Sequence, residues 1–217
     1  MDPDEVGSTY VDGTSGGTNF FLDAYECSSV TAQAAGATDS AVFYSYANDV
    51  FSGTTGTSSL SGGATNLAGG TVSILVQALG YANASVFESG SGTDQADLTS
   101  SGGGSFLSTP NASLLQLGTS SITVNTYYAP TSGGNVAVAG TIVVTGAGTD
   151  SADVDDSSGA NALSATGATA TLTAGGRSLT LNKFASVTAN QTSGTGDTVQ
   201  QGAIDFALST VGSWTSV

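Results

Sequence analysis

Positive charge is almost missing from this chain of 217 residues. Arg177 and Lys183 are its only basic residues, against 17 Asp and Glu, and the formal net charge is −15. A nucleic-acid-binding surface needs cationic groups to displace counterions from phosphates, and an anionic membrane surface repels an acidic protein. We therefore expect neither nucleic-acid binding nor membrane insertion.

Histidine is absent and cysteine occurs once, as Cys27. The absence of histidine excludes Ser-His-Asp and Cys-His nucleophilic sites and most zinc sites. One cysteine forms no internal disulfide and holds no iron–sulfur cluster. The glycine-rich run "SGGG" at 101–104 lacks the lysine of a phosphate-binding loop. The residue types thus predict a protein that is not an enzyme and has no cofactor.

Long apolar runs and good helix formers are also scarce. No run of 18 apolar residues occurs, so we expect no membrane-spanning helix. The start "MDPDEVGSTY" lacks the basic and apolar regions of a signal peptide, so the chain either is not exported by that route or is a mature form. Few segments have apolar residues at helical spacing.

The chain is instead rich in small residues and in short patterns typical of β-strands. The chain has 32 Ser, 31 Thr and 31 Gly. Leu179 and Leu181 illustrate the alternation typical of strands that bury one face. Five stretches rich in β-branched and aromatic residues are 41–46, 71–79, 121–128, 135–146 and 168–176. The fold class we predict is all-β.

An internal repeat is anchored on aspartate. Asp39, Asp94 and Asp150 stand 55 and 56 residues apart, and a degenerate copy follows at Asp197. Two residues after each of the first three is an alanine, and four residues after is an apolar side chain. A phenylalanine or leucine follows at twelve or thirteen, as Phe51, Phe106 or Leu163.

This pattern resembles the tandem repeats of very large surface proteins of planctomycete-type bacteria. The stretch "TDSADVDDSSGANAL" fits through Asp150, Ala152, Val154, Asp156, Ser157, Gly159 and Leu163. "TDQADLTSSGGGSFLST" fits in the same way, and "KFASVTA" at 183–189 resembles the connecting step between repeats. The resemblance implies an extracellular, β-solenoid-like structural segment at the cell surface, without catalytic residues.

The repeat favours a parallel β-solenoid, or β-helix, built from units of about 56 residues. A many-stranded β-sandwich is the alternative fold. We expect a single elongated domain over 1–217. Its predicted units are 1–35 (partial), 36–90, 91–146, 147–193 and 194–217 (partial).

The aspartates also suggest calcium. The stretches "GSGTDQA" and "GAGTDSA" match the turn of calcium-binding β-rolls, but they lie 56 residues apart rather than in consecutive turns. An EF-hand loop starting at Asp150 fails at its sixth and twelfth positions. Closing of turns by the aspartate carboxylate is the alternative interpretation. The calcium candidates are Asp94, Asp150, Asp153, Asp155 and Asp156.

We predict a structural subunit of an extracellular filament or surface layer, assembling head-to-tail with copies of itself by end-to-end β-stacking. The expected contact segments are 1–20 and 203–217, with Phe20, Phe21, Phe206 and Trp214. One alternative is a calcium-stabilised adhesin or stalk that binds surface glycans, for which Tyr44, Tyr46, Tyr127 and Tyr128 are stacking candidates. A virion fibre or shell protein is a further alternative.

Overall fold

In this computed structural model the chain consists of β-strands joined by turns. The described residues are 10–15, 17–23, 29–35, 38–45, 50–54, 56–65, 71–79, 81–88, 94–110, 112–125, 127–128, 136–137, 140–192 and 195–217. These ranges contain no helix, which agrees with the predicted all-β class. Accordingly, they include no helix that is long and apolar enough to cross a membrane.

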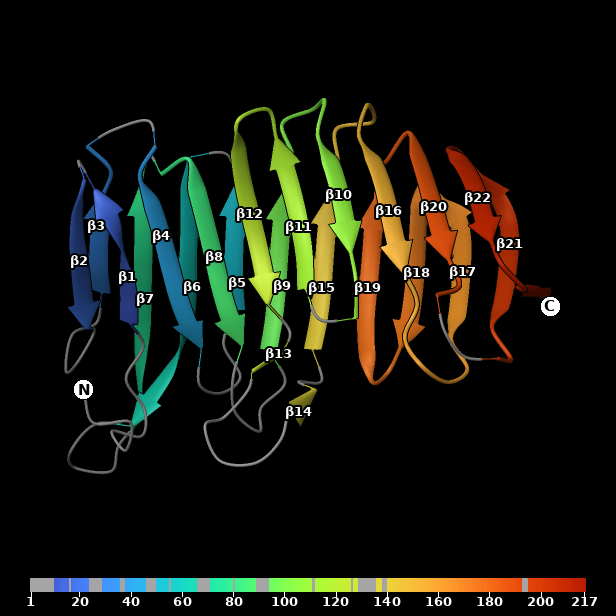
Figure 1. The fold of residues 1–217 in the computed structure, drawn as a ribbon, viewed down its shortest axis with the longest axis horizontal. Coiled ribbons are helices and arrows are strands. Elements are labelled where there is room, and N and C mark those ends of the chain that lie inside the picture. Colours follow the sequence, from blue (N-terminus) through green and yellow to red (C-terminus); the bar gives the residue numbers. More distant parts are fainter. Residues whose placement is uncertain are drawn as a thin grey trace.

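Two large sheets, which we call sheet A and sheet B, form two layers of an elongated stack (Figure 1). Sheet A has ten strands, in the spatial order β2 (Thr18–Asp23), β1 (Tyr10–Ser15), β4 (Ser40–Ser45), β8 (Asn83–Glu88), β12 (Ser120–Asn125), β11 (Ala112–Leu117), β10 (Ser105–Ser108), β16 (Ser151–Asp155), β20 (Ser186–Asn190) and β22 (Ala207–Val211).

Sheet B has eleven strands and lies behind sheet A in Figure 1. Its order is β23 (Thr215–Ser216), β21 (Thr198–Ile204), β17 (Ala162–Gly167), β18 (Thr169–Ala174), β19 (Arg177–Asn182), β15 (Gly140–Thr145), β9 (Asp94–Thr99), β5 (Val50–Thr54), β6 (Thr57–Thr65), β7 (Thr71–Leu79) and β3 (Ser29–Gln33). A separate pair is formed by β13 (Tyr127–Tyr128) and β14 (Val136–Ala137). Neither large sheet closes on itself.

Strand direction is nearly uniform within each sheet. In sheet A all strands except β1 and β11 run the same way, because each of these two lies antiparallel between neighbours. In sheet B the exceptions are β6 and β18. Three of these four reversed strands are the middle strand of an antiparallel meander, namely β10–β11–β12, β5–β6–β7 and β17–β18–β19. The fourth, β1, lies between β2 and β4. In every case the original direction returns at the next strand of the sheet.

The core lies between the layers, and alternation along the strands fills it. Strand β11 alternates half-buried and buried residues along its length, as does β19 in the opposite phase. Phe43 of sheet A and Phe51 of sheet B meet edge to face, with ring centroids 5.4 Å apart. Aromatic pairs in this geometry add stability beyond the apolar area they bury. The core thus joins the two sheets directly.

The predicted alternation is confirmed. Leu179 and Leu181 are both buried in β19. The alanines two residues after the first three anchor aspartates, the apolar residues four after them, and Phe51, Phe106 and Leu163 are also buried. These residues are buried because each repeat copy begins a strand at the same phase relative to its aspartate, in whichever sheet that strand lies.

The repeat copies do not occupy one sheet. Asp39 and Asp150 precede strands of sheet A, whereas Asp94 opens a strand of sheet B. In the stack, Ala96 of β9 pairs with Ile142 of β15, which pairs with Leu179 of β19. Residues that pair in neighbouring layers are therefore closer together along the chain than successive copies of the repeat are. The predicted unit boundaries stay a prediction.

Candidate functional site

Three of the four aspartates that anchor the repeat stand directly before a strand and are buried. Asp39 precedes β4, Asp150 precedes β16 and Asp197 precedes β21, and their exposed fractions are 3%, 0% and 0%. Asp94 is the first residue of β9, and its side chain lies outside the described residues. The turn-closing role predicted for this aspartate is confirmed for Asp39 and Asp150, each of which accepts from an amide of its own turn. Asp197 accepts hydrogen bonds from Asn161 and Gln191 instead.

Asp150 joins the turn before its own strand to a turn of the neighbouring layer. Its Oδ1 accepts hydrogen bonds from the Ser100 hydroxyl at 2.9 Å and the Gly104 amide at 2.5 Å. Its Oδ2 accepts from the Ala147 amide at 2.6 Å. A Cβ on Gly146 would lie 2.9 Å from Oδ2, so glycine is needed for this close approach. These hydrogen bonds replace the solvation that the carboxylate loses when it is buried.

Asp39 plays a similar part at the other end of the molecule. Its Oδ2 accepts from the Ala35 amide at 2.8 Å, and its backbone carbonyl accepts from the Ala82 amide at 3.2 Å. Tyr81, only 6% exposed, lies nearby. Burial of the phenol, and then the negative charge of Asp39, raise the pKa of Tyr81 above its ordinary value of 10.0. The tyrosine is thus held neutral in this core.

Asp197 and Asp156 form a contact between two buried carboxyl groups, both 0% exposed. Asp197 Oδ1 accepts from the backbone and side-chain amides of Asn161, each at 2.8 Å. Asp156 Oδ1 accepts from the Thr192 amide at 2.7 Å and the Thr192 hydroxyl at 2.6 Å.

The Asp197 carboxyl titrates below its ordinary range. Burial raises its pKa, but the hydrogen bonds that it accepts from the Asn161 backbone, the Asn161 side chain and Gln191, together with the interaction with Asp156, outweigh burial, so the pKa of Asp197 is lowered.

Gln191 links this carboxyl contact to the last strands of the chain. Its Nε2 donates to Asp197 Oδ2 at 2.5 Å, and its Oε1 accepts from the Ser213 amide at 2.6 Å. A Cβ on Gly212 would lie 2.6 Å from the Gln191 Cβ, so the turn after β22 fits closely over this side chain. The acidic contact therefore helps to position the terminal strands β22 and β23.

The remaining calcium candidates lie apart from these buried groups. The Asn190 side-chain amide donates to Oδ1 of both Asp153 and Asp155 from the neighbouring strand β20. Asp153 is exposed and Asp155 half-buried. In the described ranges no group of three or more acidic, histidine or cysteine side chains lies close enough to hold a metal ion. The calcium interpretation of the five aspartates stays a prediction.

A polar groove of about 410 Å³ crosses the outer face of sheet A over β10, β16 and β20. Its side chains stand in cross-strand ranks, with Ser105 beside Ser151 and Ser151 beside Ser186. Leu107, which is 44% exposed, lies in the next rank beside Asp153. Its surface offers hydroxyls, one carboxylate and a small apolar patch.

The C-terminal end of the stack is open. Strand β22 pairs with β20 on one side only, and β23 covers just Thr198 and Val199 of β21. Leu208 of β22 is half-buried, whereas its paired neighbour Val187 is 1% exposed. The partly buried apolar residues at this end are Val199, Ile204, Phe206, Leu208 and Trp214. The core therefore reaches the end of the molecule without being fully covered.

Of the predicted contact residues, Phe206 and Trp214 belong to this open end. The Trp214 indole N–H donates to the Val211 carbonyl at 3.2 Å, so the ring lies over the terminal layer. Phe20 and Phe21 lie on β2, the edge strand at the opposite end of sheet A. Their side chains, and those of 1–9, lie outside the described residues.

Three of the four tyrosines named as glycan candidates lie in strands. Tyr127 and Tyr128 form β13, and Tyr44 lies in β4, but their side chains and all of Tyr46 lie outside the described residues. The groove on sheet A was not anticipated from the sequence, because cross-strand ranks arise only once the strands are paired.

Sequence reasoning also missed Asn161, Gln191 and the buried Arg177. Asn161 is 2% exposed and holds both the Ser157 turn and Asp197. Arg177, 5% exposed, donates to the Thr109 carbonyl at 2.8 Å. An available signal was the position of Asn161 at the end of the turn "SSGA", directly before a strand, where side-chain amides often bond to the backbone.

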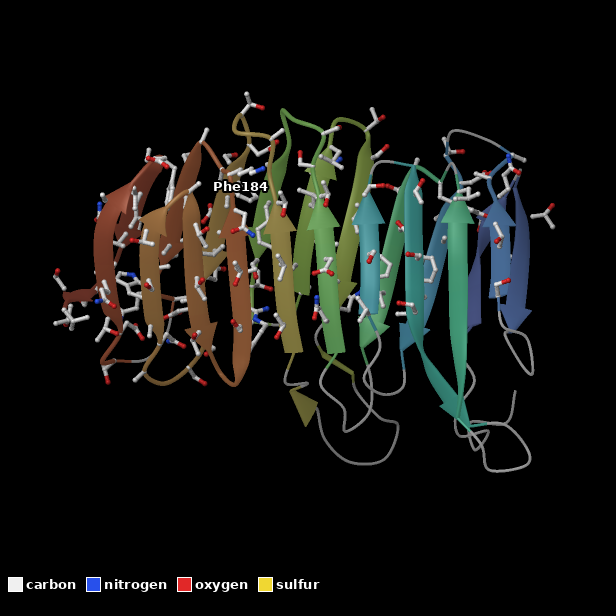
Figure 2. All side chains as sticks on the ribbon, turned by 180° about the vertical axis from the view of Figure 1, so that it is seen from behind. Phe184 is labelled. Carbon is white, nitrogen blue, oxygen red and sulfur yellow. The ribbon has the colours of Figure 1, made fainter. Side chains whose placement is uncertain are left out.

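The turn between β19 and β20 contains an aromatic residue that contacts a ring of β10. Phe184 follows β19, is 4% exposed and lies with its ring centroid 6.4 Å from that of Phe106 (Figure 2). Lys183 before it is exposed and has φ 57°. This turn covers the edge of the core where the chain passes from sheet B to sheet A.

Comparisons with protein-family models, with curated proteins and with solved structures each found no match to this chain.

Proposed function

We propose that this protein is a non-enzymatic structural subunit whose copies stack end to end into an extracellular filament or surface layer. One observation carries the proposal: both sheets end, at the C-terminal side, in strands with a free edge above a half-covered core. An unpaired strand edge is a template for pairing with another chain, and natural proteins either protect it or use it.

The open end differs from the interior in burial. Phe106, Ala152 and Val187 follow one another across β10, β16 and β20, and all are at most 3% exposed. Leu208 continues the same rank but is half-buried. A further strand beside β22 would bury the rest of Leu208 at roughly 25 cal/mol for each Å² of apolar surface.

We propose in addition that the two sheets are the two sides of a solenoid. The chain crosses from sheet B to sheet A between β9 and β10, β15 and β16, and β19 and β20, and returns between each of these pairs. The parallel pairing between successive layers supports this interpretation, since antiparallel pairing dominates immunoglobulin-type sandwiches. The antiparallel meanders are then insertions into the coil.

The proposed extracellular location is supported by the resemblance to bacterial surface repeats and by composition. A chain with two trypsin sites, one of them the buried Arg177, is suited to surroundings that contain proteases. The acidic surface keeps subunits soluble before they assemble.

Backbone geometry at β22 allows a sharp test. The Ala207 amide donates to the Ala185 carbonyl, and the Val211 carbonyl accepts from the Gln191 amide. Because successive residues of a strand point their backbone groups to opposite sides, the N–H groups of Leu208 and Thr210 face the free edge. Proline at Thr210 removes an edge donor and leaves the bonds to β20 in place.

We would examine the purified protein, Thr210→Pro and the control Thr210→Val by electron microscopy at high concentration, in calcium and in chelator. Filaments or sheets in the wild type and Thr210→Val, but not in Thr210→Pro, support the proposal. Single particles in every sample contradict it. Assembly only with calcium would instead assign the exposed aspartates to bridging between subunits.

A further inference from the structure

The two ends of the stack have the same strand direction in both sheets. In sheet A the edge strands β2 and β22 run the same way, because β1 and β11 each reverse the direction and the following strand restores it. In sheet B the edge strands β3 and β23 also run the same way, and β21 next to β23 shares their direction. The arrows of Figure 1 show this agreement.

This agreement restricts how two copies meet. A copy translated along the long axis places its β2 beside β22 and its β3 beside β21 and β23, and both new pairs are parallel. The interior pairs β20–β22 and β17–β21 are parallel in the same way. A twofold axis perpendicular to the sheets would instead pair β22 with its own copy, antiparallel. A twofold axis parallel to the strands would place sheet A of one copy beside sheet B of the other, and most strands of these two sheets run in opposite directions (Figure 1).

Charge separates the two ends as well. The segment 198–217 contains one acidic residue, Asp205, and no basic residue. The segment 1–26 contains six acidic residues and no basic residue, namely Asp2, Asp4, Glu5, Asp12, Asp23 and Glu26. Of these, Asp12 lies in β1 and Asp23 in β2, so contact between two N-terminal edges would bring copies of both acidic strands together. Like charges brought close together repel each other, which disfavours that contact.

We propose that the partner of the C-terminal edge is the N-terminal edge of a second copy, with β22 parallel to β2 and β21–β23 parallel to β3. Both sheets then continue across the contact, and the filament is polar. This inference rests on the proposed function, since it gives the partner surface for the same open end. The contact is heterologous, so it propagates without closing.

Cysteine cross-linking tests the pairing directly. In a Cys27→Ser background, Ser209→Cys places a thiol on the exposed face of β22, and Thr18→Cys places one on β2. Ser151→Cys, on the exposed mid-sheet surface, is the control. Each variant alone and each mixture would be treated with a short bis-maleimide, and the products would be separated by mass.

We expect cross-linked dimers in the mixture of the Ser209→Cys and Thr18→Cys proteins, and none with either protein alone or with the control. Dimers of the Ser209→Cys protein alone would overturn the head-to-tail pairing while leaving end-to-end assembly intact. Cross-links that involve Ser151→Cys would also overturn it, because that surface would then be the contact. Absence of assembly in microscopy, together with absence of cross-links, would overturn the proposed function and this inference with it.

Discussion

At the scale of single residues, the buried turn aspartates link neighbouring layers. Asp150 is the clearest case, since three donors converge on its carboxylate while solvent is excluded. Removing one partner of a buried hydrogen-bonded charge leaves the others without solvation. The residue therefore matters for stability far more than its small size suggests.

We expect Asp150→Ala to lower the free energy of unfolding by about 3 kcal/mol, because three donors, two of them in buried bonds, lose their acceptor. Asp153→Ala, in the strand β16 that follows Asp150, is the control, since Asp153 is exposed, and it should change stability by less than about 0.5 kcal/mol. Urea unfolding followed by circular dichroism measures both. Equal losses would show that the buried network does not contribute as the geometry indicates.

The lowered pKa of Asp197 gives a pH prediction. A carboxyl whose folded-state pKa lies below its unfolded value adds stability above that unfolded value, here near 3.8, and the stability is lost as the pH falls through the folded pKa. We expect wild-type stability to decrease below pH 3.8, and Asp197→Asn to show a shallower decrease from a lower starting stability.

Thermal unfolding from pH 2 to pH 6 measures this effect, with Asp205→Asn as the control at an exposed site. An unchanged acid slope in Asp197→Asn, together with a changed slope in Asp205→Asn, would contradict the assignment.

At the scale of elements, the close approach of turns to strands depends on glycine. A Cβ on Gly146 would lie 2.8 Å from the Lys183 carbonyl oxygen, which is backbone and cannot yield cheaply. A Cβ on Gly53 in β5 would meet only side-chain atoms, the nearest being Ile122 Cγ2 at 2.9 Å. Strands of the two sheets thus have some freedom to adjust, whereas the turns have little.

We expect Gly146→Ala to destabilise the protein by about 2–4 kcal/mol and Gly53→Ala by about 1 kcal/mol, because overpacking against backbone forces the chain to move. Chemical unfolding of the two variants side by side measures the difference. The reverse order would mean that the core between the sheets is packed more rigidly than its turns.

At the scale of the whole molecule, stability depends on neighbouring layers, and the terminal layer has a neighbour on one side only. In the strand order of the described residues, β22 pairs with β20 alone, and β23 pairs with β21 over two residues. Opening of these strands should therefore be easier than opening of the interior strands β15 and β19, which have neighbours on both sides.

We expect backbone amides of β22 and β23 to exchange with deuterium fastest among the C-terminal strands of the monomer, because local opening costs least there. Assembly should slow exchange in these strands and leave β15 and β19 unchanged. Hydrogen-exchange mass spectrometry of dilute and concentrated samples measures this. Protection that appears over the mid-sheet groove of β10 and β16 instead would place the contact on the outer face.

The sequence by itself determined the all-β class and the inward side of each strand. Alternation has a period of two residues and depends on local chain geometry, so it was readable around Leu179 and Leu181 and around the anchor aspartates. The buried Asp39 and Asp150 have the same phase as the buried Ala41 and Ala152, although the sequence pattern did not predict buried aspartates.

Only the tertiary structure decided which strands pair and what meets across the turns. The repeat spacing did not reveal that Ala96 pairs with Ile142, because pairing compares segments far apart in the chain and many offsets place small residues side by side. The contact of Asp156 with Asp197, the link through Gln191 to Ser213 and the equal direction of the edge strands arise in the same way. Each depends on long-range pairing, which local periodicity does not encode.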